Sequence, residues 1–245
     1  MPTAETVDRV FDQPIEQVSD FAFNREVADV FDNMVSRSVP SYDQIQRMLV
    51  ELAASFAQPG TNVYDLGCST GTTIALLKRA LPEDIDYVGI DYSDEMLAKC
   101  HEKLLRLEIA DRVRLASADF NQGFDVDNAS VVAMILTLMF VRPMNREKLV
   151  ADIYEGLNED GCLLLVEKVL GERSQLNRLF IEKYYDYKRR MGYSELEISQ
   201  KREALENVLI PYTADENRDM LLKAGFREVD IFFRYYNFAA FVAVK

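Results

Sequence analysis

The chain has 245 residues, of which 49% are hydrophobic and 28% are charged, and its formal net charge at pH 7 is −13. These values are ordinary for a globular protein that is large enough to bury a continuous core. The acidic balance excludes a groove that binds nucleic acid by neutralising phosphates, since such a groove requires clustered Lys and Arg. A small molecule or a protein partner fits this charge better.

Signals for membrane insertion, export and metal binding are missing from the sequence. No apolar run approaches the roughly 20 residues that cross a bilayer. Residues 1–20 carry five acidic side chains instead of the basic region of a signal peptide, so we expect a cytoplasmic protein. The cysteines are odd in number and far apart, and His101 is the single histidine, so we expect no disulfide framework and no metal site.

The first third of the chain, residues 20–57, has the periodicity of helices. Apolar residues recur at helical spacing on both sides of a break at residues 38–41. Gln58, Pro59 and Gly60 then end the helical pattern, as Pro and Gly do. We therefore expect a helical segment ahead of the first strand.

Strands alternate with helices in the middle of the chain. We predict strands at 62–66, 87–91, 113–116, within 129–140 and at 162–166, and helices at 72–80, 93–107 and 148–157. Ser93 is the expected N-cap of the second of these helices, and residues 158–161 are the expected turn into the fifth strand. This alternation predicts a parallel sheet with helices on both faces, whose strands end at one common edge where ligands bind.

The last third departs from this repeat. Residues 174–190 and 194–208 are two polar helical runs without a strand between them, followed by a helix at 214–224. Strands at 229–235 and 238–244 are joined so tightly that they form an antiparallel hairpin. The predicted fold is a doubly wound, mostly parallel α/β sheet of the Rossmann-like kind with an antiparallel C-terminal hairpin.

We expect one domain over residues 1–245. It consists of a helical cap (1–57), the core sheet (61–170), an inserted helical arm (171–210), and the terminal helix and hairpin (211–245). The arm has more polar length than one sheet can cover, so it is a lid or a dimer arm, and we expect a homodimer.

A glycine turn follows the first strand in the sequence Gly67-Cys68-Ser69-Thr70-Gly71. Glycine has no Cβ and tolerates φ > 0, so backbone at this turn can approach a ligand closely. The following helix offers free N–H groups. The spacing lacks the Gly-x-Gly-x-x-Gly fingerprint of dinucleotide sites, so a pyrophosphate is not the expected ligand.

Acidic residues follow the next two strands. Asp91 ends the second strand, 24 residues beyond Gly67, close to the spacing of about 20 at which a carboxylate accepts both ribose hydroxyls. Asp119 and Phe120 follow the third strand and offer a carboxylate for an adenine amino group and an apolar face for its ring. Together with the glycine turn, these residues predict a site for S-adenosylmethionine (SAM).

The turn, the acidic loops and the final hairpin resemble those of class I SAM-dependent methyltransferases. Residues 23–31, 37–42 and 192–202 resemble one branch of them, the carboxy-S-adenosyl-L-methionine synthases, and the resemblance runs nearly from end to end. It implies a transferase that converts SAM and prephenate into carboxy-SAM and phenylpyruvate. A partner enzyme then uses carboxy-SAM to modify a tRNA wobble uridine.

The resemblance also implies a set of site residues. By position, the residues that line SAM or carboxy-SAM are Tyr42, Gly67, Cys68, Ser69, Asp91, Tyr92, Asp119 and Phe120. Arg202 is the implied catalytic residue, because its planar guanidinium can bind the new carboxylate with two hydrogen bonds. The sequence leaves open whether Arg202 serves its own pocket or that of a second copy.

Ile135 departs from the family pattern, which has an Asn at the end of the fourth strand. An isoleucine cannot donate or accept a hydrogen bond with its side chain, so backbone groups or Thr137 would have to make this contact. Two alternatives therefore stay open. The chain could be a methyltransferase acting on a small acceptor, or a SAM-binding protein without turnover.

Overall fold

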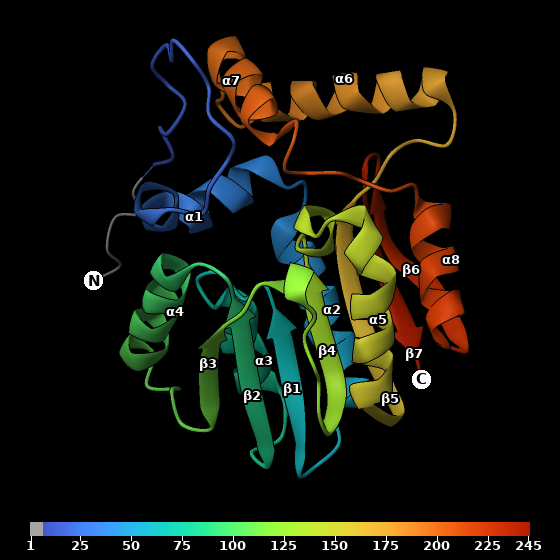
Figure 1. The fold of residues 1–245 in the computed structure, drawn as a ribbon. Coiled ribbons are helices and arrows are strands. Elements are labelled where there is room, and N and C mark those ends of the chain that lie inside the picture. Colours follow the sequence, from blue (N-terminus) through green and yellow to red (C-terminus); the bar gives the residue numbers. More distant parts are fainter. Residues whose placement is uncertain (1–6) are drawn as a thin grey trace.

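The computed structural model describes residues 7–245, in which seven strands form one sheet in the order β3-β2-β1-β4-β5-β7-β6 (Figure 1). The strands are β1 (Thr61–Leu66), β2 (Ile85–Asp91), β3 (Val113–Ser117), β4 (Ala129–Ile135), β5 (Leu157–Lys168), β6 (Glu228–Tyr235) and β7 (Phe238–Val244). The first five strands are parallel, and β7 is antiparallel to both β5 and β6. This arrangement confirms the predicted doubly wound sheet and its terminal hairpin. The first six residues of the expected cap lie outside the described residues.

Helices cover both faces of the sheet. The helices are α1 (Arg25–Ser38), α2 (Tyr42–Phe56), α3 (Thr72–Ala80), α4 (Asp94–Arg106), α5 (Pro143–Gly156), α6 (Ser174–Arg190), α7 (Glu195–Leu205) and α8 (Ala214–Ala224). On one face, α2, α3 and α4 pack against the sheet, and on the other α5 and α8 do so. Within residues 7–245, no helix is both long and apolar enough to span a bilayer.

The strands of the sheet centre are buried on both sides, as parallel strands between two helical layers must be. In β1, Val63 belongs to the core under α2 and α3, whereas Tyr64 and Leu66 belong to the core under α5. This alternation follows from the two-residue period of a strand. It also determines which side chains of β1 enter each of the two cores before the chain reaches the glycine turn.

The site lies at the carboxyl edge of the parallel strands. There β1 lies between β2 and β4, and the strand order changes direction at β1. The helices that follow β1 and β4 therefore lie on opposite faces of the sheet, which opens a crevice between these two strands. Two short 3-10 turns, η1 (Phe120–Gln122) and η2 (Leu138–Phe140), follow β3 and β4 at this edge. Helices α1, α6 and α7 and the segment before α1 lie beyond it (Figure 1). The Phe21 backbone N–H donates to the Ala204 carbonyl at 2.8 Å, which ties this segment to α7.

Several predicted boundaries are wrong; α7, for example, ends at Leu205 instead of residue 208, and β2 begins at Ile85 instead of residue 87. Residues 20–24 are extended rather than helical, because Asn24 caps α1 by accepting from the Val27 N–H at 3.0 Å. Helix α5 begins at Pro143 instead of residue 148, since proline suits the first helical position. The expected turn at 158–161 lies inside β5 as an irregularity in its pairing with β4.

Candidate functional site

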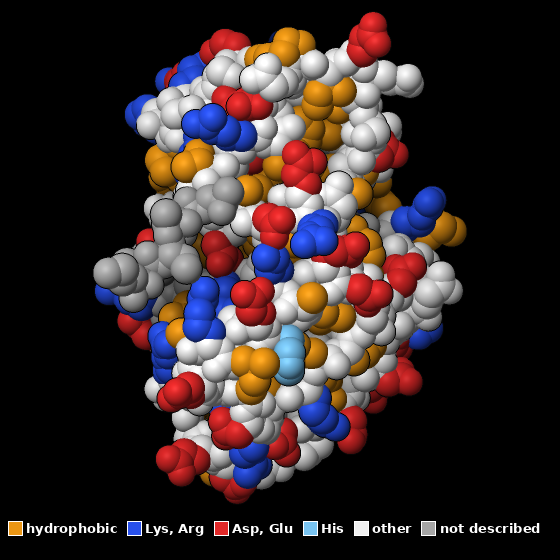
Figure 2. All heavy atoms as spheres, turned by 90° about the vertical axis from the view of Figure 1, so that its left-hand side faces the viewer, with side chains coloured by type: hydrophobic (Ala, Val, Ile, Leu, Met, Phe, Trp, Pro, Cys, Tyr) orange, Lys and Arg blue, Asp and Glu red, His pale blue; other side chains and the backbone are white. Residues whose placement is uncertain are grey.

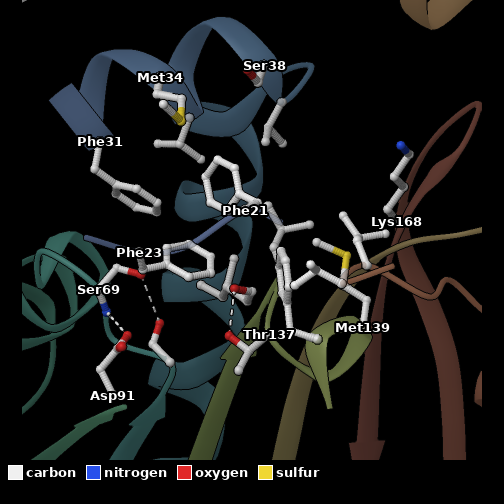
Figure 3. A pocket seen from close by; sticks show the side chains of 18 of the residues that line it. Phe21, Phe23, Phe31, Met34, Ser38, Ser69, Asp91, Thr137, Met139 and Lys168 are labelled. Carbon is white, nitrogen blue, oxygen red and sulfur yellow. Dashed lines mark hydrogen bonds between the residues drawn. The ribbon is translucent and has the colours of Figure 1, made fainter. Parts of the chain in front are cut away.

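A cavity of about 410 Å³ opens at the carboxyl ends of β1, β2 and β4, within the size range of small-molecule sites (Figure 3). The structure brings all eight predicted binding residues to its wall: Tyr42, Gly67, Cys68, Ser69, Asp91, Tyr92, Asp119 and Phe120. Most of the remaining wall is apolar and comes from α1, α7, η2 and the segment before α1. Such a wall encloses a ligand and keeps water away from it.

The glycine turn has the backbone geometry that its sequence predicts. Gly67 and Gly71 have φ values of +84° and +77°, a region that other residues rarely adopt. A Cβ at Gly67 would collide with the Thr137 side chain, and one at Gly71 would collide with the Cys100 thiol. The turn therefore requires glycine at both positions, and its backbone lies directly against the cavity.

Asp91 joins this turn to the end of β2. One carboxylate oxygen accepts from the Ser69 N–H at 2.9 Å (Figure 3). The other accepts from the Ser93 N–H at 3.0 Å. Asp91 is buried, and burial raises its pKa, while the hydrogen bonds from Ser93 and Ser69 oppose that rise. Each oxygen keeps a lone pair for a further donor, so the carboxylate fits the two hydroxyls of a ribose.

Asp119 and Phe120 lie beyond the end of β3. The Asn121 N–H donates to Asp119 at 2.9 Å, and this bond holds the pKa of the carboxyl below its ordinary value. Asp119 is thus an ionised acceptor at the cavity rim. Phe120 is buried and offers a ring face, and the exposed Tyr92 ring packs edge-on against Phe23 with 6.0 Å between centroids. These residues have the chemistry of an adenine site.

Tyr42 and Cys68 are held in uncharged forms. The Gln46 amide donates to the Tyr42 hydroxyl at 2.8 Å and to the Thr73 hydroxyl at 3.1 Å, while burial raises the pKa of Tyr42. A hydrogen bond with Cys100 and burial raise the pKa of the Cys68 thiol. Neither side chain is therefore an ionised base at neutral pH. Among residues 7–245, no group of three or more His, Cys, Asp or Glu could hold a metal ion.

Arg202 does not line the cavity of its own chain. It is exposed on α7, whereas the preceding residue, Lys201, is buried and contributes to the cavity wall. Adjacent helical residues point about 100° apart, so only one of the two can face inward. In the single chain, the cation that α7 presents to the cavity is Lys201.

Ile135 lines the cavity at the position where a hydrogen-bonding side chain was expected. Two residues further on, the Thr137 hydroxyl donates to the Ile135 carbonyl at 3.0 Å (Figure 3). Thr137 also lies against Gly67. The hydroxyl oxygen retains lone pairs, so Thr137 is the polar side chain that the end of β4 offers to a ligand.

Sequence reasoning missed two groups of cavity residues. Phe21 and Phe23 line the cavity from the extended segment before α1, and their two-residue spacing was the available signal for an extended chain. Lys168 and Lys201 also line it, from the end of β5 and from α7. Nothing local distinguishes these two lysines from solvated ones, because they come together only in the tertiary structure.

Comparison with known proteins agrees with this geometry. A family model described as a methyltransferase domain matches residues 63–161. A carboxy-S-adenosyl-L-methionine synthase from Methylococcus capsulatus is 55% identical, covering 97% of this chain and 99% of that protein. A synthase of the same name from Nautilia profundicola is 43% identical, with 97% and 99% covered.

Solved structures share the fold at low sequence identity. A SAM-dependent methyltransferase from Aquifex aeolicus superimposes with a TM-score of 0.61 at 16% identity, covering 91% of this chain and 99% of that one. An O-methyltransferase family protein from Burkholderia thailandensis gives 0.64 at 14% identity, with 91% and 60% covered.

Proposed function

Because the chain belongs to the carboxy-S-adenosyl-L-methionine synthase family, a group of SAM-dependent transferases, we propose that it converts SAM and prephenate into carboxy-SAM and phenylpyruvate. One observation carries the proposal. A single cavity combines polar groups suited to SAM at one end with lysine side chains at the other.

The chain's own residues would hold SAM along the sheet edge. Asp91 accepts from the ribose hydroxyls, and Asp119 and Phe120 take the adenine. The Gly67 turn packs beside the methionine portion, where backbone replaces bulky side chains. Thr137 supplies the hydrogen bond that Ile135 cannot make.

The reaction balances without a metal or a redox partner. Prephenate becomes aromatic by losing its ring carboxylate as CO2 and its ring hydroxyl as hydroxide. The sulfonium acidifies its methyl group, whose proton combines with that hydroxide to form water. The electron pair left on the methyl carbon forms a bond to CO2, which gives the carboxymethyl group of carboxy-SAM.

The apolar wall contributes by excluding water from this exchange. Free CO2 and a carbanion both react with water, so their capture by each other requires a dry and ordered site. Phe23, Phe140 and Ile135 form part of that wall. The uncharged Tyr42 and Cys68 agree with a reaction whose base comes from the co-substrate itself.

We place Arg202 at the new carboxylate of a second copy's cavity, which makes the active form a homodimer. The exposed position of Arg202, outside its own cavity, supports this placement. Exposed leucines on the same arm, Leu176 and Leu179 of α6 and Leu196 of α7, provide apolar surface for a subunit contact. Light scattering at micromolar concentration tests the assembly, and a monomer would refute it.

We propose that carboxy-SAM made here supplies tRNA wobble modification in the cytoplasm through a partner enzyme, and that this chain does not itself bind tRNA. The net charge of −13 supports this separation. On the face seen in Figure 2, acidic and basic side chains are interspersed, without the basic groove that a phosphate backbone requires.

Methyl transfer to a small acceptor is the second candidate, and the observation in its favour is Ile135. Mass spectrometry of the ligand that co-purifies with the protein decides between the two. A species heavier than SAM by one CO2 supports carboxy-SAM synthesis. Unmodified SAM or S-adenosylhomocysteine, with no carboxylated product after prephenate is added, would refute it.

A further inference from the structure

Three lysines gather at the end of the cavity that is remote from the SAM-binding edge. Lys168 ends β5 and Lys201 lies on α7, and both line the cavity, while Lys188 is buried on α6 beside them. In Figure 3 the Lys168 ammonium lies across the cavity from Asp91. We call Lys168, Lys188 and Lys201 the lysine cluster.

The lysine cluster packs around the rings of two tyrosines, Tyr184 and Tyr193. The Lys168 ammonium lies 5.0 Å from the centre of the Tyr184 ring, and that of Lys201 lies 5.6 Å from the centre of Tyr193. The Lys188 ammonium lies between the rings, 5.8 Å from Tyr184 and 5.1 Å from Tyr193. The ring faces favour cations at these distances, so the three charges share one apolar corner.

Two carboxylates lie at this corner, and one of them forms an ion pair with Lys201. Asp8 accepts from the Tyr193 hydroxyl at 2.6 Å and lies 3.8 Å from the Lys201 ammonium. Glu197 caps α7 by accepting from the backbone N–H and the hydroxyl of Ser194. Arg37 adds a fourth cation, 4.1 Å above the Tyr193 ring.

Four cations thus face two carboxylates at a buried place in a protein whose overall charge is −13. Burying a cation without a partner is costly, and proteins pair such charges or place them at functional sites. This cost appears as lowered pKa values of the three lysines. Burial, with the neighbouring Lys201 and Lys168, lowers the pKa of Lys188 to about 7, and burial lowers the pKa values of Lys168 and Lys201 to about 8.

We propose that the lysine cluster is the subsite that binds the carboxylates of a dianionic co-substrate. The proposal rests on the proposed function, for which it names the residues that select the second substrate. An ammonium donates up to three hydrogen bonds, and several ammonium groups around one corner suit two carboxylates better than one. The apolar side chains of the cavity wall between this corner and Asp91 suit the ring of such a co-substrate.

Binding can be separated from turnover by loading the protein with S-adenosylhomocysteine, which has no methyl group to carboxylate. Prephenate titrated into this complex by calorimetry should bind, and phenylpyruvate, with a single carboxylate, should bind at least about tenfold more weakly. Lys188→Met and Lys168→Met should each raise the prephenate Kd about tenfold or more while the SAM Kd stays within about twofold.

The matched control is Lys183→Met on the same helix α6, where the exposed ammonium lies 3.5 Å from Asp186. It should leave both dissociation constants unchanged. Lys188→Arg, which keeps the charge, should retain most of the prephenate affinity. An unchanged prephenate Kd in both methionine variants would overturn the subsite.

A measurement on the unaltered protein covers the case in which the variants do not fold. The lysines bind anions only when protonated, so prephenate affinity should fall roughly tenfold or more between pH 7 and pH 9. The other charged or titratable groups facing the cluster are Asp8, Arg37, Glu197, Tyr184 and Tyr193. A flat profile would contradict the subsite.

The outcomes separate the two proposals. Lysine-dependent prephenate binding without carboxy-SAM formation would retain the subsite and refute the proposed reaction. Carboxy-SAM formation with an unchanged KM for prephenate in both methionine variants would retain the reaction and refute the subsite.

Discussion

The Asp91 carboxylate accepts the Ser69 N–H at 2.9 Å, so the glycine turn after β1 is fastened to the end of β2. In the mode of SAM binding that we propose, this one side chain shapes the backbone beside the methionine portion and offers its remaining lone pairs to the ribose. The two halves of the SAM site are mechanically coupled through this bond.

Asp91→Asn should raise the SAM Kd by about 10- to 100-fold, because an amide replaces a charged acceptor that also orders the turn. Calorimetry measures the change. The matched control is Asp86→Asn on the same strand, whose carboxylate lies 3.1 Å from Arg112 Nε and away from the cavity wall. Equal SAM affinity in Asp91→Asn and the unaltered protein would contradict this role.

Gly67→Ala should destabilise the fold by about 2 kcal/mol or more, since it combines a positive φ with a collision against Thr137. Gly60→Ala separates the two causes. Gly60 also has a positive φ of +75°, but the nearest atom to its added Cβ would be 3.9 Å away. Urea unfolding should therefore show a smaller loss, about 1 kcal/mol, for Gly60→Ala.

Thr137→Val should raise the SAM Kd about fivefold, because it removes the hydroxyl that we propose binds the ligand at the end of β4. Adding Ile135→Asn to this variant should restore most of the affinity by supplying an amide at the neighbouring cavity position. Calorimetry on both variants measures this. Unaltered affinity in Thr137→Val would show that backbone groups make the contact instead.

At SAM concentrations well below the Kd of Asp91→Asn, mixing Arg202→Ala with Asp91→Asn should restore activity that neither variant shows alone under the same conditions. In a mixed dimer, the cavity with an intact Asp91 receives Arg202 from the other subunit, so about a quarter of all sites become competent after random exchange. Carboxy-SAM formation after subunit exchange is the readout. If Arg202 served its own cavity, no mixed site would be complete and the mixture would stay inactive.

Asp65→Asn should flatten the dependence of stability on pH between pH 5 and pH 7. Burial, followed by the nearby Asp91, raises the pKa of Asp65 from 3.8 to about 7, and burial raises that of Glu167 to about 8. The folded state thus binds protons that the unfolded state has released, so stability falls as pH rises through this window.

Each such carboxyl contributes up to about 1.4 kcal/mol per pH unit to this fall. Asp65→Asn should remove the contribution of Asp65 to the decrease of stability with pH, whereas the contribution of Glu167 should remain. Thermal melts of the ligand-free protein at several pH values measure both slopes. Identical slopes in the variant and the unaltered protein would show that Asp65 ionises normally.

Local patterns in the sequence determined the sheet and the SAM end of the site. The alternation of strands and helices required a parallel sheet, and a parallel sheet brings the ends of β1, β2 and β3 to one edge. The glycine turn, Asp91 and Asp119 could therefore be placed together without coordinates. These residues could be placed because each follows the end of a strand, and the hydrophobic pattern of the sequence locates strand ends well.

Only the tertiary structure decided which cations face the cavity. Lys168, Lys188 and Lys201 come from a strand and two helices, and no local pattern relates them. The sequence pointed to Arg202, but the helical phase of α7 turns Lys201 toward the cavity and leaves Arg202 exposed. Helix phase and the packing of α6 and α7 over the sheet depend on contacts between distant segments, which periodicity within one segment does not specify.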